Sequence, residues 1–171
     1  MNKILLLVIA TVMLFACGKT DENKSGLFSA SNNFDLSSSW INTQTIVNEL
    51  SHSGKFSSKM DSTQEYGIGI RAKFNELTDK LPKKVNVHCW IYSKSPVLEA
   101  TLVCDPTINE QSISWQGLDL KTKITKANEW IEFNHSFDLP KNITPDSKFL
   151  VYFWNPKKVI FYVDDLDISL E

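Results

Sequence analysis

The segment VNVHCWIYSKSPVLEATLVC, residues 85–104, decides the fold. Polar and apolar residues alternate on both sides of Ser95-Pro96, and a period of two is the pattern of a half-buried β-strand. Serine followed by proline is typical of a turn. The segment therefore predicts two strands, 85–92 and 97–104, joined as a hairpin.

Five further stretches alternate in the same way and are bounded by Gly, Pro, Asn or Asp. No stretch of the sequence shows sustained helical periodicity. Short strands at this spacing are typical of an all-β sandwich or barrel, and we expect a sandwich of two antiparallel sheets. The five stretches are 66–74, 112–120, 130–139, 149–154 and 159–170.

Two cysteines fall inside the predicted hairpin. Cys89 and Cys104 have the same parity as the apolar residues of their strands, so both are expected to face one core. Two outcomes remain open. An oxidising compartment permits a disulfide if the two Cβ atoms come within about 3.5–4.5 Å; otherwise both residues are buried free thiols.

The N-terminal residues have the order of a secretory signal. A single cation, Lys3, precedes an apolar run, and a small residue stands before Cys17. The run is too short to cross a hydrocarbon core, which needs about 20 apolar residues. Residues 17–31 are polar and predict a flexible tether. Residues 32–171 are then enough for one domain.

The segment Leu14-Phe15-Ala16-Cys17 resembles the lipobox of bacterial lipoproteins. The resemblance implies that residues 1–16 are a signal peptide and that Cys17 carries the lipid. Two or three acyl chains would anchor the chain firmly, because each buried methylene contributes ~0.8 kcal/mol. In the enterobacterial sorting rule, an aspartate directly after the lipidated cysteine retains the protein at the inner membrane. Gly18 occupies that position, which implies delivery to the outer membrane. Which side of the outer membrane the domain faces is left open. The alternative is an ordinary signal peptide with an incidental cysteine.

A second resemblance covers residues 32–171. Several motifs follow one another in the order found in jelly-roll carbohydrate-binding modules, the galactose-binding-like superfamily. The resemblance implies two antiparallel sheets, frequently a structural calcium ion, and a ligand site on a concave sheet face or at the edge loops. It also places Trp40 and Trp130 at packing positions. The motifs are NFD (33–35) with Trp40, HSGKFSS (52–58), NEWIEF (128–133) with FDLP (137–140), VYFW (151–154) and FYVDDL (161–166).

The last predicted strand contains a carboxylate in an apolar position. Asp164 shares parity with the apolar residues of 159–170 and is expected to point into the core. Such a group must be paired or must bind a cation, because isolated burial costs several kcal/mol. The superfamily positions imply calcium held by Asp35, Asp164 and backbone carbonyls near Ser53. The alternative is Asp164 held by backbone amides or by Lys55 without a metal.

Aromatic side chains supply the candidate ligand site. In the strand 85–92, three rings alternate with core residues and are expected on the outer face of a sheet. Flat exposed rings suit sugars, which stack their C–H surfaces on them, while polar neighbours fix the orientation. The alternative for these rings is packing; Trp115 is left undecided. The candidate ligand-binding residues are His88, Trp90, Tyr92, Trp154 and Arg71.

Two functions remain open. The sequence has no HExxH motif, no G-x-S-x-G motif and no Gly-rich phosphate loop, so we predict no catalysis. A formal net charge of −2 without a basic stripe argues against nucleic acid. The first function is a non-catalytic, lipid-anchored module that binds carbohydrate at the outer membrane. The alternative is a protein-interaction or assembly subunit of an envelope complex.

Overall fold

The computed structural model describes residues 28–32 and 40–171. The predictions made for residues 1–27, which include the signal peptide and the lipid on Cys17, lie outside these ranges, as does the predicted calcium ligand Asp35. Within the described ranges, none of the helices combines the length and the apolar character needed to cross a membrane.

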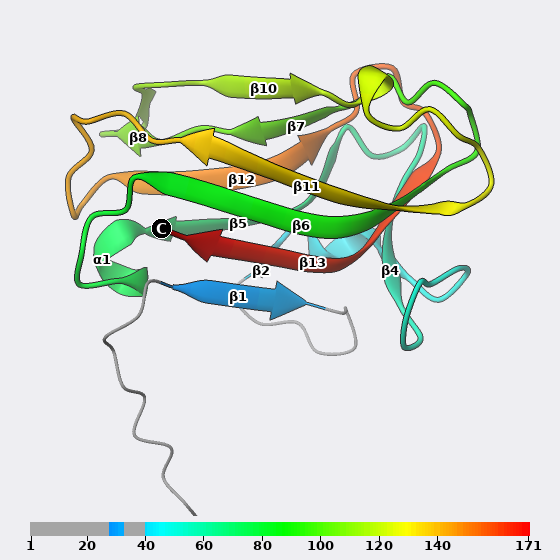
Figure 1. The fold of residues 1–171 in the computed structure, drawn as a ribbon, viewed down its shortest axis with the longest axis horizontal. Helices are drawn as coiled ribbons and strands as arrows, with labels where there is room; N and C mark the ends of the chain where they lie inside the picture. Colours follow the sequence, from blue (N-terminus) through cyan, green and yellow to red (C-terminus); the bar gives the residue numbers. More distant parts are fainter. Residues whose placement is uncertain (1–27, 33–39) are drawn as a thin grey trace, which may run out of the picture.

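Two antiparallel sheets face each other and form a jelly-roll sandwich, as predicted (Figure 1). Sheet A follows the order β11-β6-β13-β4-β3, and β1 also pairs with β13. Its strands are β1 (Ser29–Asn32), β3 (Ile46–Val47), β4 (Ser57–Met60), β6 (Lys84–Ser93), β11 (Trp130–Asp138) and β13 (Phe161–Leu170).

Sheet B follows the order β10-β7-β12-β5-β2, and β8 joins it through β12 and pairs with β9. In the part of the chain that the structure describes, three short helices connect the strands: η1 (Thr43–Thr45), α1 (Phe74–Leu77) and η2 (Leu120–Thr122). The strands of sheet B are β2 (Trp40–Ile41), β5 (Tyr66–Lys73), β7 (Thr101–Cys104), β8 (Thr107–Ile108), β9 (Gln111–Ser112), β10 (Gln116–Asp119) and β12 (Lys148–Trp154).

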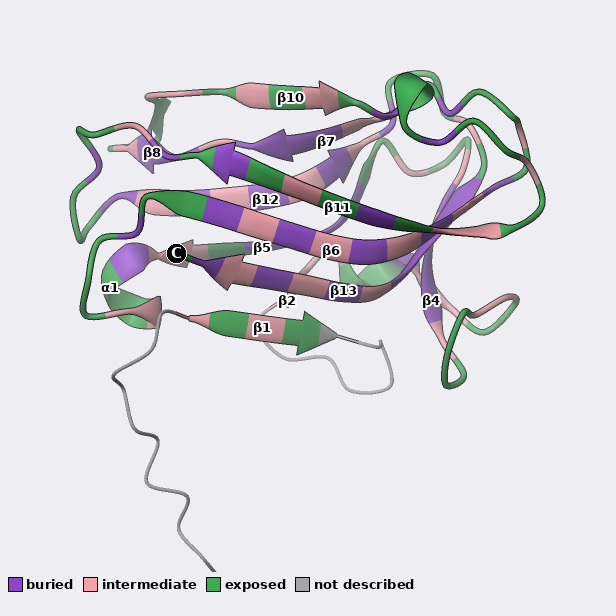
Figure 2. Ribbon diagram, viewed as in Figure 1, coloured by how far each residue is buried: buried purple, intermediate pink, exposed green. Residues whose placement is uncertain are grey.

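Strand alternation builds the core between the sheets. Along β6 and β12 every second residue is buried, and Figure 2 shows this banding on β6 and β13. Fully burying one such side chain contributes about 1.5–3 kcal/mol, so the shared inner face holds the sandwich together. Trp40 packs against this core, as predicted. The inner residues include Val85, Val87, Ile91, Phe149, Val151 and Phe153.

The predicted hairpin between β6 and β7 is wrong. The connection leaves sheet A after Ser93, and β7 pairs with β10 and β12 in sheet B. Cys89 and Cys104 therefore face the core from opposite sheets, and both are buried free thiols. Burial raises the pKa of both thiols, that of Cys104 to about 12. The alternation indicated β6 correctly, but of the predicted strand 97–104 only Thr101–Cys104 is a strand, and the pattern contains no information on which strands pair.

A β-bulge reverses the faces of β13 in mid-strand. The pairing with β6 shifts register between Asp164 and Asp167, and Asp165 adopts a positive φ of 47°. Val163 before the bulge and Leu166 after it both belong to the core. Asp164 therefore lies on the outer face of sheet A, and the prediction that it points into the core is wrong, because the extra residue changes the parity.

Candidate functional site

The outer face of sheet A has an aromatic end, which a loop covers. Trp90 is stacked under the ring of His52, with centroids 3.9 Å apart and planes inclined by 12°. Trp130, which pairs with Tyr92 on the neighbouring strand, contacts the edge of the same His52 ring at 5.7 Å. Tyr92 contacts Trp130 and Tyr162. Trp90 and Tyr92, predicted as ligand contacts, thus pack against protein here, and Trp130 packs on the outer face.

A buried carboxylate fixes the loop that carries His52. Asp164 is fully buried, and its Oδ2 accepts the backbone N–H groups of His52 at 2.7 Å and Ser53 at 3.1 Å. Its Oδ1 accepts the N–H of Asp165 at 2.8 Å. Burial raises the pKa of Asp164, and the three hydrogen bonds oppose that shift. These contacts correspond to the alternative in which backbone amides hold the carboxylate.

The same contacts bear on the predicted calcium ion. Calcium needs oxygen ligands, whereas the loop presents N–H donors to Asp164. Across the part of the chain that the structure describes, no group of three or more His, Cys, Asp and Glu side chains could hold a metal ion. Calcium also depended on Asp35, which is not described, and it stays a prediction.

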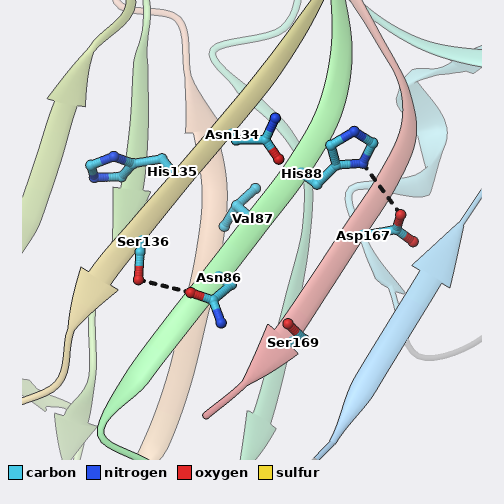
Figure 3. Close-up of a pocket in the computed structure, with 8 residues that line it drawn as sticks. All are labelled: Asn86, Val87, His88, Asn134, His135, Ser136, Asp167 and Ser169. Atoms are coloured by element: carbon cyan, nitrogen blue, oxygen red, sulfur yellow. Dashed lines mark hydrogen bonds and ion pairs between the residues drawn. The ribbon is translucent and has the colours of Figure 1, made fainter.

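A polar groove of about 640 Å³ continues along sheet A beyond the aromatic end (Figure 3). His88 lies between two carboxylates: its Nε2 is 3.0 Å from Glu132 and its Nδ1 is 3.4 Å from Asp167. Ser136 donates a hydrogen bond of 2.8 Å to the side-chain oxygen of Asn86. Most of the side chains that line this groove are polar, and the rings among them are the imidazoles of His88 and His135.

The outer face of sheet B carries exposed rings. Tyr66 and Trp115 are each 50% exposed. The ring of Tyr66 contacts Tyr152 at 5.9 Å, and that of Trp115 contacts Trp154 at 6.5 Å. Burial raises the pKa of Tyr152, while a hydrogen bond from Trp115 acts in the opposite direction. We call Tyr66, Trp115, Tyr152 and Trp154 the aromatic platform.

A second β-bulge sets the position of Tyr66 in the platform. Tyr66 pairs with Trp154 and Gly69 pairs with Tyr152, so two residues of β5 stand opposite the single residue Phe153. Both of these residues, 67 and 68, are buried. The bulge thereby places Tyr66 on the outer face, beside Trp154.

Glycines leave room for the other two rings. A Cβ at Gly69 would lie 2.1 Å from the carbonyl oxygen of Val151 and 2.9 Å from Cβ of Tyr152. A Cβ at Gly117 would lie 2.3 Å from the far edge of the Trp115 indole. All three distances are below van der Waals contact. Gly69 thus permits the close approach of β12 that carries Tyr152, and Gly117 leaves the space that the Trp115 ring occupies.

Polar and charged side chains surround the platform. At one end, the indole N–H of Trp154 donates to Glu65 at 3.2 Å. At the other end, Nη2 of Arg71 is 3.0 Å from one carboxylate oxygen of Glu110, and Lys148 Nζ contacts the other oxygen. The hydrogen bond and charge of Lys148, together with Arg71, lower the pKa of Glu110. The platform thus ends in an ion-paired cluster.

The structure divides the predicted ligand-binding residues between two faces. Trp154 and Arg71 lie on sheet B, whereas the other three lie on the opposite outer face and cannot join them in one site. Tyr66 was missed and Trp115 was left undecided. The signal for Tyr66 was the run YGIGI (66–70), because glycines inside a strand often mark a bulge or a close approach.

Comparisons with known proteins establish the fold. No family model and no curated protein matches the chain. Among solved structures, the xylan-binding CBM22-2 domain of Paenibacillus barcinonensis Xyn10C is 18% identical, with a TM-score of 0.55 over 85% of this chain and 100% of that one. A structure described as the xylan-binding domain from CBM 22 is 12% identical, with a TM-score of 0.50 over 85% and 96%. The domain has the jelly-roll fold of carbohydrate-binding modules.

A third similar structure contains an enzyme as well. The CBM22-1-GH10 modules of Clostridium thermocellum xylanase 10B, solved with xylohexaose, are 12% identical, with a TM-score of 0.50. The match covers 85% of this chain and 29% of that one. At these identities the similarity describes the β-sandwich and does not assign a ligand.

Proposed function

We propose that this protein is a non-catalytic module that binds a carbohydrate chain across the aromatic platform. The observation that carries the proposal is the half-exposed state of Tyr66 and Trp115 on a sheet face. Exposed rings bordered by hydrogen-bonding side chains are the usual composition of a sugar site, in which rings supply contact area and polar groups supply orientation. Solved modules of the same fold are named as xylan-binding, which supports the same class of ligand.

The inclination of the rings indicates the form of that ligand. The planes of Tyr66 and Tyr152 are 59° apart, and those of Trp115 and Trp154 are 86° apart. Rings so inclined share no common plane. They suit a single, twisted glycan chain and not the flat surface of a crystalline polysaccharide.

The proposal includes the lipid anchor on Cys17 and attachment to the outer membrane. The described chain enters the domain at Phe28, whose carbonyl accepts the N–H of Leu170, and continues as β1 at the margin of sheet A (Figure 1). The platform lies on sheet B. A tether that ends at β1 would therefore attach to the sheet opposite the platform and leave the rings open to a glycan.

Affinity electrophoresis tests this function. The chain without residues 1–16, with Cys17→Ser to remove the lipid site, is run through gels that contain xylan or other soluble polysaccharides. We expect retardation by at least one glycan, and its loss in Tyr66→Ala and Trp115→Ala. Leu81→Ala, which removes another exposed apolar side chain, is the matched control. Retardation that survives both ring substitutions would contradict the platform, and no retardation by any glycan would favour the protein-interaction alternative.

A further inference from the structure

A carboxylate is already bound at one end of the aromatic platform. Glu110 places one oxygen 3.0 Å from Arg71 Nη2 and the other against Lys148 Nζ. The two cations come from neighbouring strands, β5 and β12, and both face outward on the sheet that carries the platform. We propose that Arg71 and Lys148 form a subsite for the carboxylate of a glycan, and that Glu110 fills it in the free protein.

The register of sheet B places this subsite within reach of a ligand on the rings. Arg71 pairs with Leu150, which precedes Tyr152 by two positions on the outer face of β12. Two residues of a strand span about 7 Å. A short oligosaccharide stacked on Tyr152 can therefore extend over Arg71, and Lys148 lies one further step along the same strand.

The position of Glu110 depends on a tight turn. Ile108 pairs with Gln111, so Asn109 and Glu110 form a two-residue hairpin loop between β8 and β9. Both loop residues have positive φ, 50° and 63°, as the favoured two-residue hairpin turns require. The pairing of β8 with β12 fixes the base of this hairpin. The backbone thus holds the Glu110 side chain next to the two cations.

The ion pairs themselves are easily exchanged. Arg71 is 49% exposed and Glu110 is 59% exposed, and ion pairs in that setting are weak because water screens them. A ligand carboxylate can therefore replace Glu110 at little cost. Arg71 is suited to this exchange, because a guanidinium presents paired N–H donors that match the two oxygens of a carboxylate.

The chemical class that follows is a glycan that bears uronic acids. A neutral glycan would leave the Arg71–Glu110–Lys148 cluster in place and use the rings alone. A uronate would add a charge-assisted contact at the end of the platform. Glu110 would then act as an internal competitor, and its removal would favour acidic ligands specifically. This inference rests on the proposed function, since it names the ligand class of the same face.

The test compares acidic glycans with the same glycans after their carboxyl groups are reduced to alcohols. Affinity electrophoresis or calorimetry measures binding of glucuronic-acid-substituted xylan and polygalacturonate, each with its reduced form. We expect Glu110→Gln to strengthen binding of the acidic forms by about two- to fivefold and to leave the reduced forms nearly unchanged. Arg71→Gln and Lys148→Gln are expected to remove the preference for the acidic forms, and high salt is expected to do the same.

The outcomes separate the two proposals. Equal binding of acidic and reduced glycans by the wild type and by Glu110→Gln would overturn the carboxylate subsite and leave the sugar-binding function standing. A gain for both forms in Glu110→Gln would also overturn it, because the residue would then obstruct any glycan sterically. Binding of neither form by either protein would overturn the proposed function and this inference with it.

Discussion

The imidazole of His52 lies parallel to the indole of Trp90, with the ring centroids 3.9 Å apart and the planes inclined by 12°. His52 reaches this position because Asp164 binds its backbone N–H and Asp165 contacts its side chain at 2.7 Å. One face of Trp90 is therefore covered by the protein itself. This relationship makes Trp90 a packing residue and directs the search for a ligand to the other sheet.

Substitution of Trp90 tests that assignment. We expect Trp90→Ala to lower the free energy of unfolding by about 2 kcal/mol, because it removes the surface on which His52 stacks. Glycan binding, measured below the unfolding transition, is expected to remain at the wild-type level. Chemical denaturation and affinity electrophoresis measure the two effects. A stable variant that loses glycan binding would instead assign the ligand site to sheet A.

Trp115 is expected to show the opposite behaviour. Half of this side chain is exposed, so Trp115→Ala is expected to change the unfolding free energy by only about 0.5 kcal/mol. Truncating an aromatic anchor of a binding site commonly costs more than about 1 kcal/mol, so we expect glycan affinity to fall by about tenfold. Titration calorimetry checks the affinity. Unchanged affinity would remove Trp115 from the platform.

The two platform glycines form a matched pair. An added Cβ at Gly117 meets the far edge of the Trp115 ring, which can move aside, whereas at Gly69 it meets the backbone oxygen of Val151. We expect Gly117→Ala to keep its stability and lose glycan affinity. Gly69→Ala is expected to lose about 2–3 kcal/mol of stability, as overpacked sites do. Thermal melts measure the stability of the two variants, and gel retardation measures their glycan affinity. Equal losses of stability in both variants would contradict the contacts deduced for the two added Cβ atoms.

The pH dependence of stability is expected to report on Asp164. Its pKa in the folded protein is raised by burial, so the folded state holds this proton more tightly than the unfolded state does. The contribution of Asp164 to stability is therefore largest below the unfolded pKa of about 3.9. It decreases as the pH rises through the raised folded pKa and is constant above it.

The contribution of Asp164 to stability is measured by denaturing the wild type and Asp164→Asn at pH values that span the unfolded and folded pKa of this carboxyl group. We expect the stability of the wild type relative to the variant to decrease as the pH rises. If the stability of the wild type relative to Asp164→Asn instead increases with pH, the folded protein favours the ionised carboxylate. That result would mean that the N–H donors, or a cation beside them, outweigh the effect of burial.

Calcium is tested separately by thermal melting. The predicted calcium ion would raise the melting temperature in excess calcium chloride above that in excess EDTA, whereas equal melting temperatures would leave Asp164 held by the N–H donors of His52 and Ser53 without a metal. The Asp35→Asn variant serves as the second readout, since it removes the other predicted ligand. A melting temperature that rises with calcium in the wild type, but not in Asp35→Asn, would demonstrate a metal site.

The alternation in the sequence was sufficient to predict the sandwich but not its details. Along β6 and β12 the period of two places each side chain on the correct face, because a regular strand has no other choice. Both bulges escaped detection, since each shifts the phase of the alternation by one residue inside what was interpreted as a single regular strand. Asp164 was therefore assigned to the wrong face, and the partnership of Tyr66 with Trp154 was not foreseen.

The candidate site was harder to predict than the fold because it combines distant segments. Trp115 lies outside any strand and reaches the platform only because Gly117 lacks a side chain. His52 covers Trp90 from a loop whose position depends on Asp164, far along the chain. Such contacts follow from tertiary structure, and the local sequence pattern does not contain them.

The buried state of the two cysteines has a consequence for how the protein can be made. Disulfide exchange and oxidation require the thiolate, and burial raises the pKa of Cys104 to about 12 and that of Cys89 as well. Neither sulfur is then reactive at neutral pH once the sandwich has closed. Cys89 and Cys104 therefore need neither a thiol oxidase nor a disulfide isomerase for the domain to fold. A chain produced in a reducing cytoplasm is therefore expected to fold into the same domain as one exported through a membrane.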